Sequence, residues 1–153
     1  MALFLDFPKG DREAGTQLNR ESLTWIANLS LVLLGLIGNA MGPAMPSVIG
    51  EYGITLATAG MIFTARGLGQ LVAVFSTSSW SDRVGRKPVM RLGGILAAIG
   101  LLGYGFSRVW LGHVISVTIL GAGMGMLDGA SNALVSDLHT EKRGLALNRL
   151  HVF

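Results

Sequence analysis

The sequence contains no cysteine and has few charged residues. Only 14% of its 153 residues carry a charge, compared with roughly 25% in soluble domains. The lack of cysteine excludes a disulfide-stapled domain, thiolate catalysis and a cysteine-ligated metal. Half of the residues are apolar, which excludes a disordered chain and is not typical of a cytosolic enzyme. The 22 glycines follow no collagen period and suit closely packed membrane helices.

Long runs without charge predict four membrane-spanning helices. A span needs about 20 apolar residues. Residues 22–50 contain no charged residue, and the later runs at 55–79, 92–107 and 109–135 are interrupted only by Arg66 and Asp128. No segment has the alternating pattern of a membrane-spanning strand. We therefore predict an all-α membrane protein with helices over about 24–48, 55–79, 89–107 and 109–136.

The segments outside these spans carry most of the positive charge. Residues 1–22 form a mixed-charge tail, and residues 138–153 form a polar loop with the start of a fifth helix. Of the 12 Lys and Arg residues, three lie in the tail, four in the 80–91 loop and three in the end segment. Because cytoplasmic loops are enriched in Lys and Arg, we predict a multi-pass protein of the plasma (inner) membrane with both ends cytoplasmic. The net charge of +3 then reflects the enrichment of Lys and Arg on the cytoplasmic side of the membrane. We therefore expect the lipid bilayer as a partner and expect no binding of nucleic acid.

Three of the predicted helices have a face of polar and small residues, because residues spaced by three, four or seven share one side of a helix. We expect these faces to meet other protein or a water-filled cavity, and helix 89–107 to face lipid. Pro43 and Pro46 are predicted to bend the first helix, and Gly38-x-x-x-Gly42 fits a close helix contact. Helix by helix, the three faces are Asn28, Gly35, Asn39, Gly42 and Pro46; Thr55, Ala59, Arg66, Gln70, Ala73 and Thr77; and Gly121, Gly125, Asp128, Asn132 and Ser136.

Arg66 and Asp128 are the two charges predicted to lie within the membrane. A charge at the bilayer centre costs roughly 2.5–3.5 kcal/mol on insertion scales. One alternative is a structural ion pair, because the predicted depths differ by only about 6 Å. The other is that Asp128 binds a proton or contacts a solute in a pathway that Arg66 also lines. Asn39, Gln70 and Asn132 are candidates either for hydrogen bonds to a polar solute or for bonds between helices.

Other motifs argue against catalysis. The run GAGMGMLDG at 121–129 follows no strand, so we interpret it as a close helix contact and not as a dinucleotide-binding loop. No Walker motif, nucleophile elbow or HExxH occurs. We expect His113 at the outer membrane interface, and no histidine pair has metal spacing near an acid. We therefore expect no enzyme, no metal and no cofactor, with a proton as the coupling ion.

The segment WSDRVGRKPVMRLG after the second predicted span carries the most specific motif. Asp82, Arg83, Gly85, Arg86 and Lys87 match the G-x-L-a-D-r-x-G-r-k loop signature, so the segment resembles that of the major facilitator superfamily. The resemblance implies twelve helices in two halves, secondary transport of a small-molecule solute, and a conformational-switch role for these five residues. It extends over about 24–153 and implies that the chain is an N-terminal fragment that lacks the C-terminal helices of the same transporter.

Two further stretches, LDGASNALV and LNRLH, are similar to the fucose-permease-like sugar:proton symporters of this superfamily. In that group an acid of the fourth helix takes part in coupling, which implies this role for Asp128. The acid of the group's first helix is absent, because the matching stretch reads Asn39-Ala-Met-Gly42. We therefore expect proton-coupled transport of a small polar solute such as a sugar. A proton-driven multidrug exporter is the alternative, because such exporters share the 82–87 signature, and a non-transporting four-helix membrane protein is a further one.

Overall fold

The computed structural model consists of four α-helices. It describes residues 9–138, 144–145 and 148, with the side chains from Ser22 onward except that of Ser78. Each helix contains a stretch that is long and apolar enough to cross a membrane, and no strand occurs within these residues, so the predicted all-α membrane fold is confirmed. The predicted fifth helix falls almost entirely outside the described residues. The helices are α1 (Lys9–Tyr52), α2 (Leu56–Val84), α3 (Arg86–Phe106) and α4 (Trp110–Leu138).

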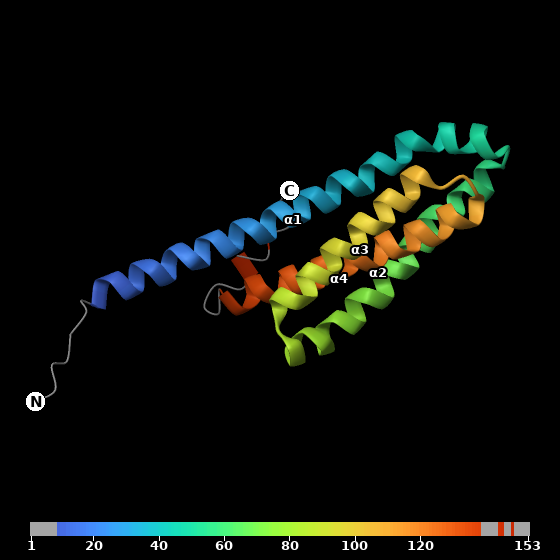
Figure 1. Cartoon of the computed structure of the whole chain (residues 1–153). Helices are drawn as coiled ribbons and strands as arrows, with labels where there is room; N and C mark the ends of the chain where they lie inside the picture. The colour runs from blue at the N-terminus through green and yellow to red at the C-terminus, as the bar shows by residue number, and fades with distance from the viewer. Residues whose placement is uncertain (1–8, 139–143, 146–147, 149–153) are drawn as a thin grey trace, which may run out of the picture.

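Helix α1 begins well before its apolar stretch. That stretch is Ser22–Tyr52, yet the helix begins at Lys9, and its N-terminal part extends beyond the other three helices (Figure 1). The predicted tail 1–22 is therefore helical from Lys9 onward. Glu, Arg and Gln are good helix formers, so the end of an apolar run does not end a helix. The helix continues through Pro43 and Pro46, and its last turns lean toward α2 (Figure 1).

A single residue, Gly85, joins α2 to α3. Its φ of 90° lies in the left-handed region, which glycine adopts without the strain that a Cβ would impose. The Gly85 N–H donates to the carbonyl of Ser81 at 3.0 Å and so closes α2. The predicted 80–91 loop is wrong in extent, because both helices continue through its polar residues.

Helix α4 is the centre of the bundle. It packs along both α2 and α3 and less extensively against α1, whereas α2 and α3 touch each other little. A Cβ at Gly121 would overlap the carbonyl oxygen of Arg66 on α2, and a Cβ at Gly123 would overlap the backbone of Ala97 on α3. The glycine run at 121–129 therefore makes close helix contacts on two sides, which confirms its interpretation.

The predicted polar and small face of α2 lies against α4. A Cβ at Gly125 would overlap the carbonyl oxygen of Gln70, and Gly129 lies beside the methyl group of Thr77. The close contact of α1 predicted at Gly38 and Gly42 is found at only one of the two glycines. A Cβ at Gly38 would press on Arg66, but one at Gly42 would meet nothing within 4 Å.

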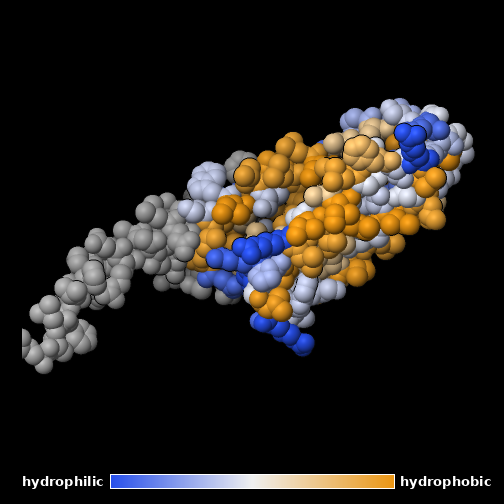
Figure 2. Space-filling model, viewed as in Figure 1, coloured by the Kyte–Doolittle hydropathy of each residue, from blue (hydrophilic) through white to orange (hydrophobic). Residues whose placement is uncertain are grey.

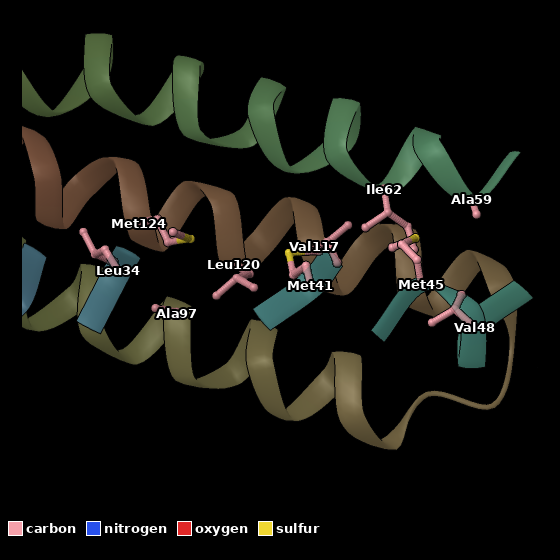
Figure 3. Packing of buried hydrophobic residues seen from close by; sticks show 10 residues of the cluster. All are labelled: Leu34, Met41, Met45, Val48, Ala59, Ile62, Ala97, Val117, Leu120 and Met124. Atoms are coloured by element: carbon pink, nitrogen blue, oxygen red, sulfur yellow. The ribbon is translucent and has the colours of Figure 1, made fainter. Parts of the chain in front are cut away.

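Apolar side chains from all four helices fill the space between α1 and the other three (Figure 3). Figure 3 shows α4 running between α2 and α3, with its side chains directed toward those of α1. This packing sets the rotation of each helix and thereby decides which polar residues face inward. The cluster consists of Leu34, Met41, Met45, Val48, Ala59, Ile62, Ala97, Val117, Leu120 and Met124.

The outside of the bundle is also apolar. Figure 2 shows apolar residues over the middle of the visible face and polar residues toward its two ends. Helix α3 exposes Ile95, Ile99 and Leu102, which fits its predicted contact with lipid. Large apolar side chains of α1 and α2 are exposed as well, among them Trp25 and Phe75. Such surfaces require lipid or further helices as neighbours.

Candidate functional site

Arg66 extends from α2 so that its guanidinium lies between α1 and α4. Its Nη1 is 3.9 Å from the sulfur of Met124, and a Cβ at Gly38 would lie 2.9 Å from the same atom. Its Nε is buried and has no hydrogen-bond partner among the described residues. Burial of a charge is costly unless the charge is paired and hydrogen-bonded. Arg66 is therefore a cation that the described bundle itself does not neutralise.

Asp128 lies well inside α4, one turn beyond Met124, and is half-buried. Its Oδ1 accepts a hydrogen bond of 2.8 Å from Nδ2 of Asn132. The spacing of four residues places both side chains on one face of the helix. Among the described residues neither ion pair includes Asp128 or Arg66. The structural ion pair that the sequence left open is thus not formed in this structure.

Neither Asn39 nor Gln70 is bonded to Arg66. Asn39 lies on α1 and Gln70 lies on α2, the helix of Arg66. Asn39 follows Gly38 and is exposed, and its Nδ2 donates to the carbonyl of Gly35 at 2.8 Å. Gln70 lies one turn beyond Arg66 and is half-buried, and its side chain forms no hydrogen bond with another described residue. The predicted pathway residues on α1, α2 and α4 therefore share no hydrogen-bond network within the part of the chain that the structure describes, and their role in a pathway stays a prediction.

Arg86 joins the ends of three helices. From the start of α3, its Nη1 lies 2.7 Å from Oδ1 of Asp82 near the end of α2. Its Nε lies 3.1 Å from Oδ2 of Asp137 near the end of α4. Nη1 also donates to the hydroxyl of Ser81. A fork of guanidinium donors suits such a junction, because each donor has a fixed direction.

The predicted switch residues divide into two groups. Asp82, Gly85 and Arg86 form the turn and its junction, whereas Arg83 and Lys87 are exposed and belong to no ion pair in the described part of the chain. Sequence reasoning missed Asp137. The available signal was an acid at the end of the fourth span, on the side where the basic residues gather. Its partner could not be inferred, because helix packing decides which acid meets Arg86.

A second polar cluster joins α1 to the turn between α3 and α4. The hydroxyl of Tyr52 donates to the carbonyl of Ser107 at 3.0 Å and lies 3.2 Å from Nδ1 of His113. The rings of Tyr104 and His113 are 4.6 Å apart. His113 is only 4% exposed and lies in the first turn of α4, at the end of that helix where we expect the outer membrane interface. The aromatic rings around it shield it from the surface.

The arrangement can bind protons and polar groups inside the membrane-spanning region. A carboxyl group and a guanidinium lie on neighbouring helices about one turn apart. The first can take up and release a proton, and the second can bind a negatively charged or strongly polar group. Within the described ranges no group of three His, Asp or Glu side chains is placed to hold a metal ion.

Comparisons with known proteins agree with this arrangement of helices. The family model described as Major Facilitator Superfamily matches residues 27–153. Protein TsgA of Escherichia coli O1:K1 / APEC and Protein TsgA of Escherichia coli O157:H7 (strain EC4115 / EHEC) are each 26% identical over 124 residues. The match covers 81% of this chain and 32% of theirs, so the chain spans about a third of the length of these curated relatives. No solved structure matches the chain.

Proposed function

Because the chain belongs to the Major Facilitator Superfamily, we propose that it forms the N-terminal part of a proton-coupled secondary transporter of the plasma membrane. The transporter carries a small polar solute such as a sugar. The four helices act together with further helices of the same transporter, and both ends of the chain face the cytoplasm. The solute and the proton pass along the faces of α1, α2 and α4 that carry Asn39, Arg66, Gln70, Asp128 and Asn132.

The observation that carries this proposal is the half-buried carboxyl group of Asp128 inside α4. An ionised carboxylate at such a depth is expensive, whereas a protonated one is not. Asp128 is the acid to which we assign the uptake and release of the coupling proton. The amide of Asn132, 2.8 Å away, holds the carboxyl group in one orientation.

The junction at Arg86 supports alternating access. Transporters of this type move one half against the other around a site near the bilayer midplane. Helix α4 packs extensively along α2 and α3, so these three helices form a unit, and Arg86 links their ends. The side chain of Asp82 is 61% exposed despite its bond to Arg86. It therefore has free oxygen surface with which to contact a helix of the other half when the cytoplasmic side closes.

The test uses the full-length transporter that contains these residues, reconstituted in proteoliposomes with an imposed pH gradient. Asp128→Asn is expected to abolish uptake driven by the gradient and to spare solute exchange at equal pH, because binding remains while proton release does not. Glu51→Gln, which removes an exposed acid near the end of α1, is the control and is expected to keep pH-driven uptake. Unchanged pH-driven uptake by Asp128→Asn would contradict the coupling role.

The same vesicles test which class of solute is transported and whether it is taken up or extruded. A panel of sugars is compared with a fluorescent dye that drug exporters extrude. We expect pH-driven accumulation of a sugar-like solute and no dye movement. Dye extrusion without uptake of any polar solute would favour the drug exporter.

A further inference from the structure

The charge of Arg66 is left uncompensated by the described residues. Its Nε is buried without a hydrogen-bond partner, and its Nη1 has only the sulfur of Met124, 3.9 Å away, as a polar neighbour among them. Ionisable residues inside a membrane almost always pair with another group or mark a substrate pathway. Arg66 therefore requires a partner outside the described residues, and the strongest hydrogen bonds of a guanidinium are those to an anion.

The four acidic residues with described side chains do not supply this anion. Asp82 and Asp137 are both bonded to a different arginine at the end of the bundle. Asp128 accepts its hydrogen bond from an amide on its own helix. Glu51 lies near the end of α1, about 20 Å along the helix axis from the level of Arg66.

Helix α1 passes close to the guanidinium and carries small residues there. Gly38 is the point at which α1 passes Nη1. Gly35 and Gly42 flank it on the same face, and a Cβ on either would meet nothing within 4 Å. The exposed amide of Asn39 follows directly. A cation whose neighbours on α1 are small residues and an amide suits a small group that is both negatively charged and polar.

We infer that the transported solute bears a carboxylate, and that Arg66 binds this group between α1 and α4. The inference rests on the proposed transport function and narrows its solute class. A guanidinium binds a carboxylate through two parallel hydrogen bonds, and one of these satisfies the orphaned Nε. A neutral sugar offers only hydroxyl groups and leaves the cation unpaired. A hydroxylated acid such as a sugar acid satisfies both Arg66 and the neighbouring amides.

The first test measures binding to the purified full-length transporter with matched acidic and neutral probes. Gluconate and glucuronate are compared with glucose, and lactate with glycerol, by their protection against thermal unfolding. At least one acid is expected to raise the unfolding temperature with increasing concentration while its neutral counterpart does not. Arg66→Gln is expected to weaken binding of that acid by about tenfold or more. Arg66→Lys keeps the positive charge but not the planar guanidinium, and it is expected to weaken binding of the acid less than Arg66→Gln does.

The second test separates a binding role from a structural one. In the ligand-free protein, Arg66→Met removes a charge that has no partner, so the unfolding temperature is expected to stay or to rise. The matched control is Arg91→Met on α3, an exposed cation, which is expected to change it little. If Arg66 instead belonged to a structural ion pair, Arg66→Met would leave a buried acid alone and lower the temperature markedly. That result would overturn the inference.

Transport assays distinguish failure of the inference from failure of the proposed function. Protection and pH-driven uptake with neutral sugars, retained in Arg66→Gln and not seen with any acid, would overturn the inference and leave the proposed function intact. No pH-driven uptake of either class would contradict the proposed function itself.

Discussion

Arg86 at the start of α3 is bonded to Asp137 at the end of α4, with Nε 3.1 Å from Oδ2, although 51 residues separate them in the sequence. The same guanidinium lies 2.7 Å from Asp82. One cation thus links the adjoining ends of three helices on the surface of the bundle. Because both acids are more than half exposed, the junction is better suited to a reversible contact than to holding the fold together.

Asp137→Asn is expected to change transport more than stability. Exposed ion pairs contribute about 0.2–1 kcal/mol, so the unfolding temperature should fall by no more than about 4 °C. The rate of solute uptake should fall several-fold, because the end of α4 is no longer tied to the turn at Gly85. Thermal unfolding and initial uptake rates in proteoliposomes measure the two effects. Arg91→Gln, which removes an exposed cation of α3, is the control and should alter neither. Unchanged uptake together with a large loss of stability would show that the junction is structural.

Gly85→Ala is expected to destabilise the protein by about 1–3 kcal/mol, because an alanine there must hold a left-handed backbone conformation. Gly94→Ala, in α3 and with open space around it, is the matched control. It should be neutral or gain about 0.5–1 kcal/mol, since alanine favours a helix over glycine. Denaturant unfolding of the two variants provides the comparison. Equal free energies of unfolding for the two variants would mean that the turn accommodates an alanine without loss of stability.

Gly121→Ala is expected to push α2 away from α4, because the added methyl group overlaps the carbonyl oxygen of Arg66. Overpacking of this kind costs about 1–3 kcal/mol. Gly67→Ala on α2 has nothing within 4 Å of its Cβ position and should be tolerated. Size-exclusion profiles and unfolding temperatures in detergent test this difference. Equal behaviour of the two variants would refute the close contact between α2 and α4.

Tyr52→Phe and Tyr104→Phe form a matched pair within one aromatic cluster. The hydroxyl of Tyr52 donates to Ser107 and contacts His113, so its removal should cost about 0.5–1.5 kcal/mol or more. The hydroxyl of Tyr104 is buried without a partner among the described residues, and its removal should be neutral or stabilising. Unfolding temperatures measure both. A greater loss for Tyr104→Phe would show that its hydroxyl has a bound partner, such as water.

The sequence predicted the spans better than the helices. Absence of charge marks where a chain can cross a membrane, and this property is local, so each predicted span falls on one of the four helices that are long and apolar enough to cross a membrane. Helix ends follow backbone hydrogen bonding, and polar helix formers extend α1 back to Lys9 and α2 forward to Val84. The loop expected at 80–91 is consequently reduced to one residue, Gly85.

The sequence by itself determined that the described part of the chain has four helices able to cross a membrane, that the glycines at 121–129 pack closely, and that Arg66 and Asp128 lie within two of these helices. These follow from composition and spacing along one chain. Only the tertiary structure decided that Arg66 faces Gly38 and Met124 while Asp128 bonds Asn132, and that Arg86 meets Asp137. Such pairings depend on the rotation and register of neighbouring helices, which the close contacts at Gly121, Gly123 and Gly125 set. No local pattern along the chain encodes those two quantities.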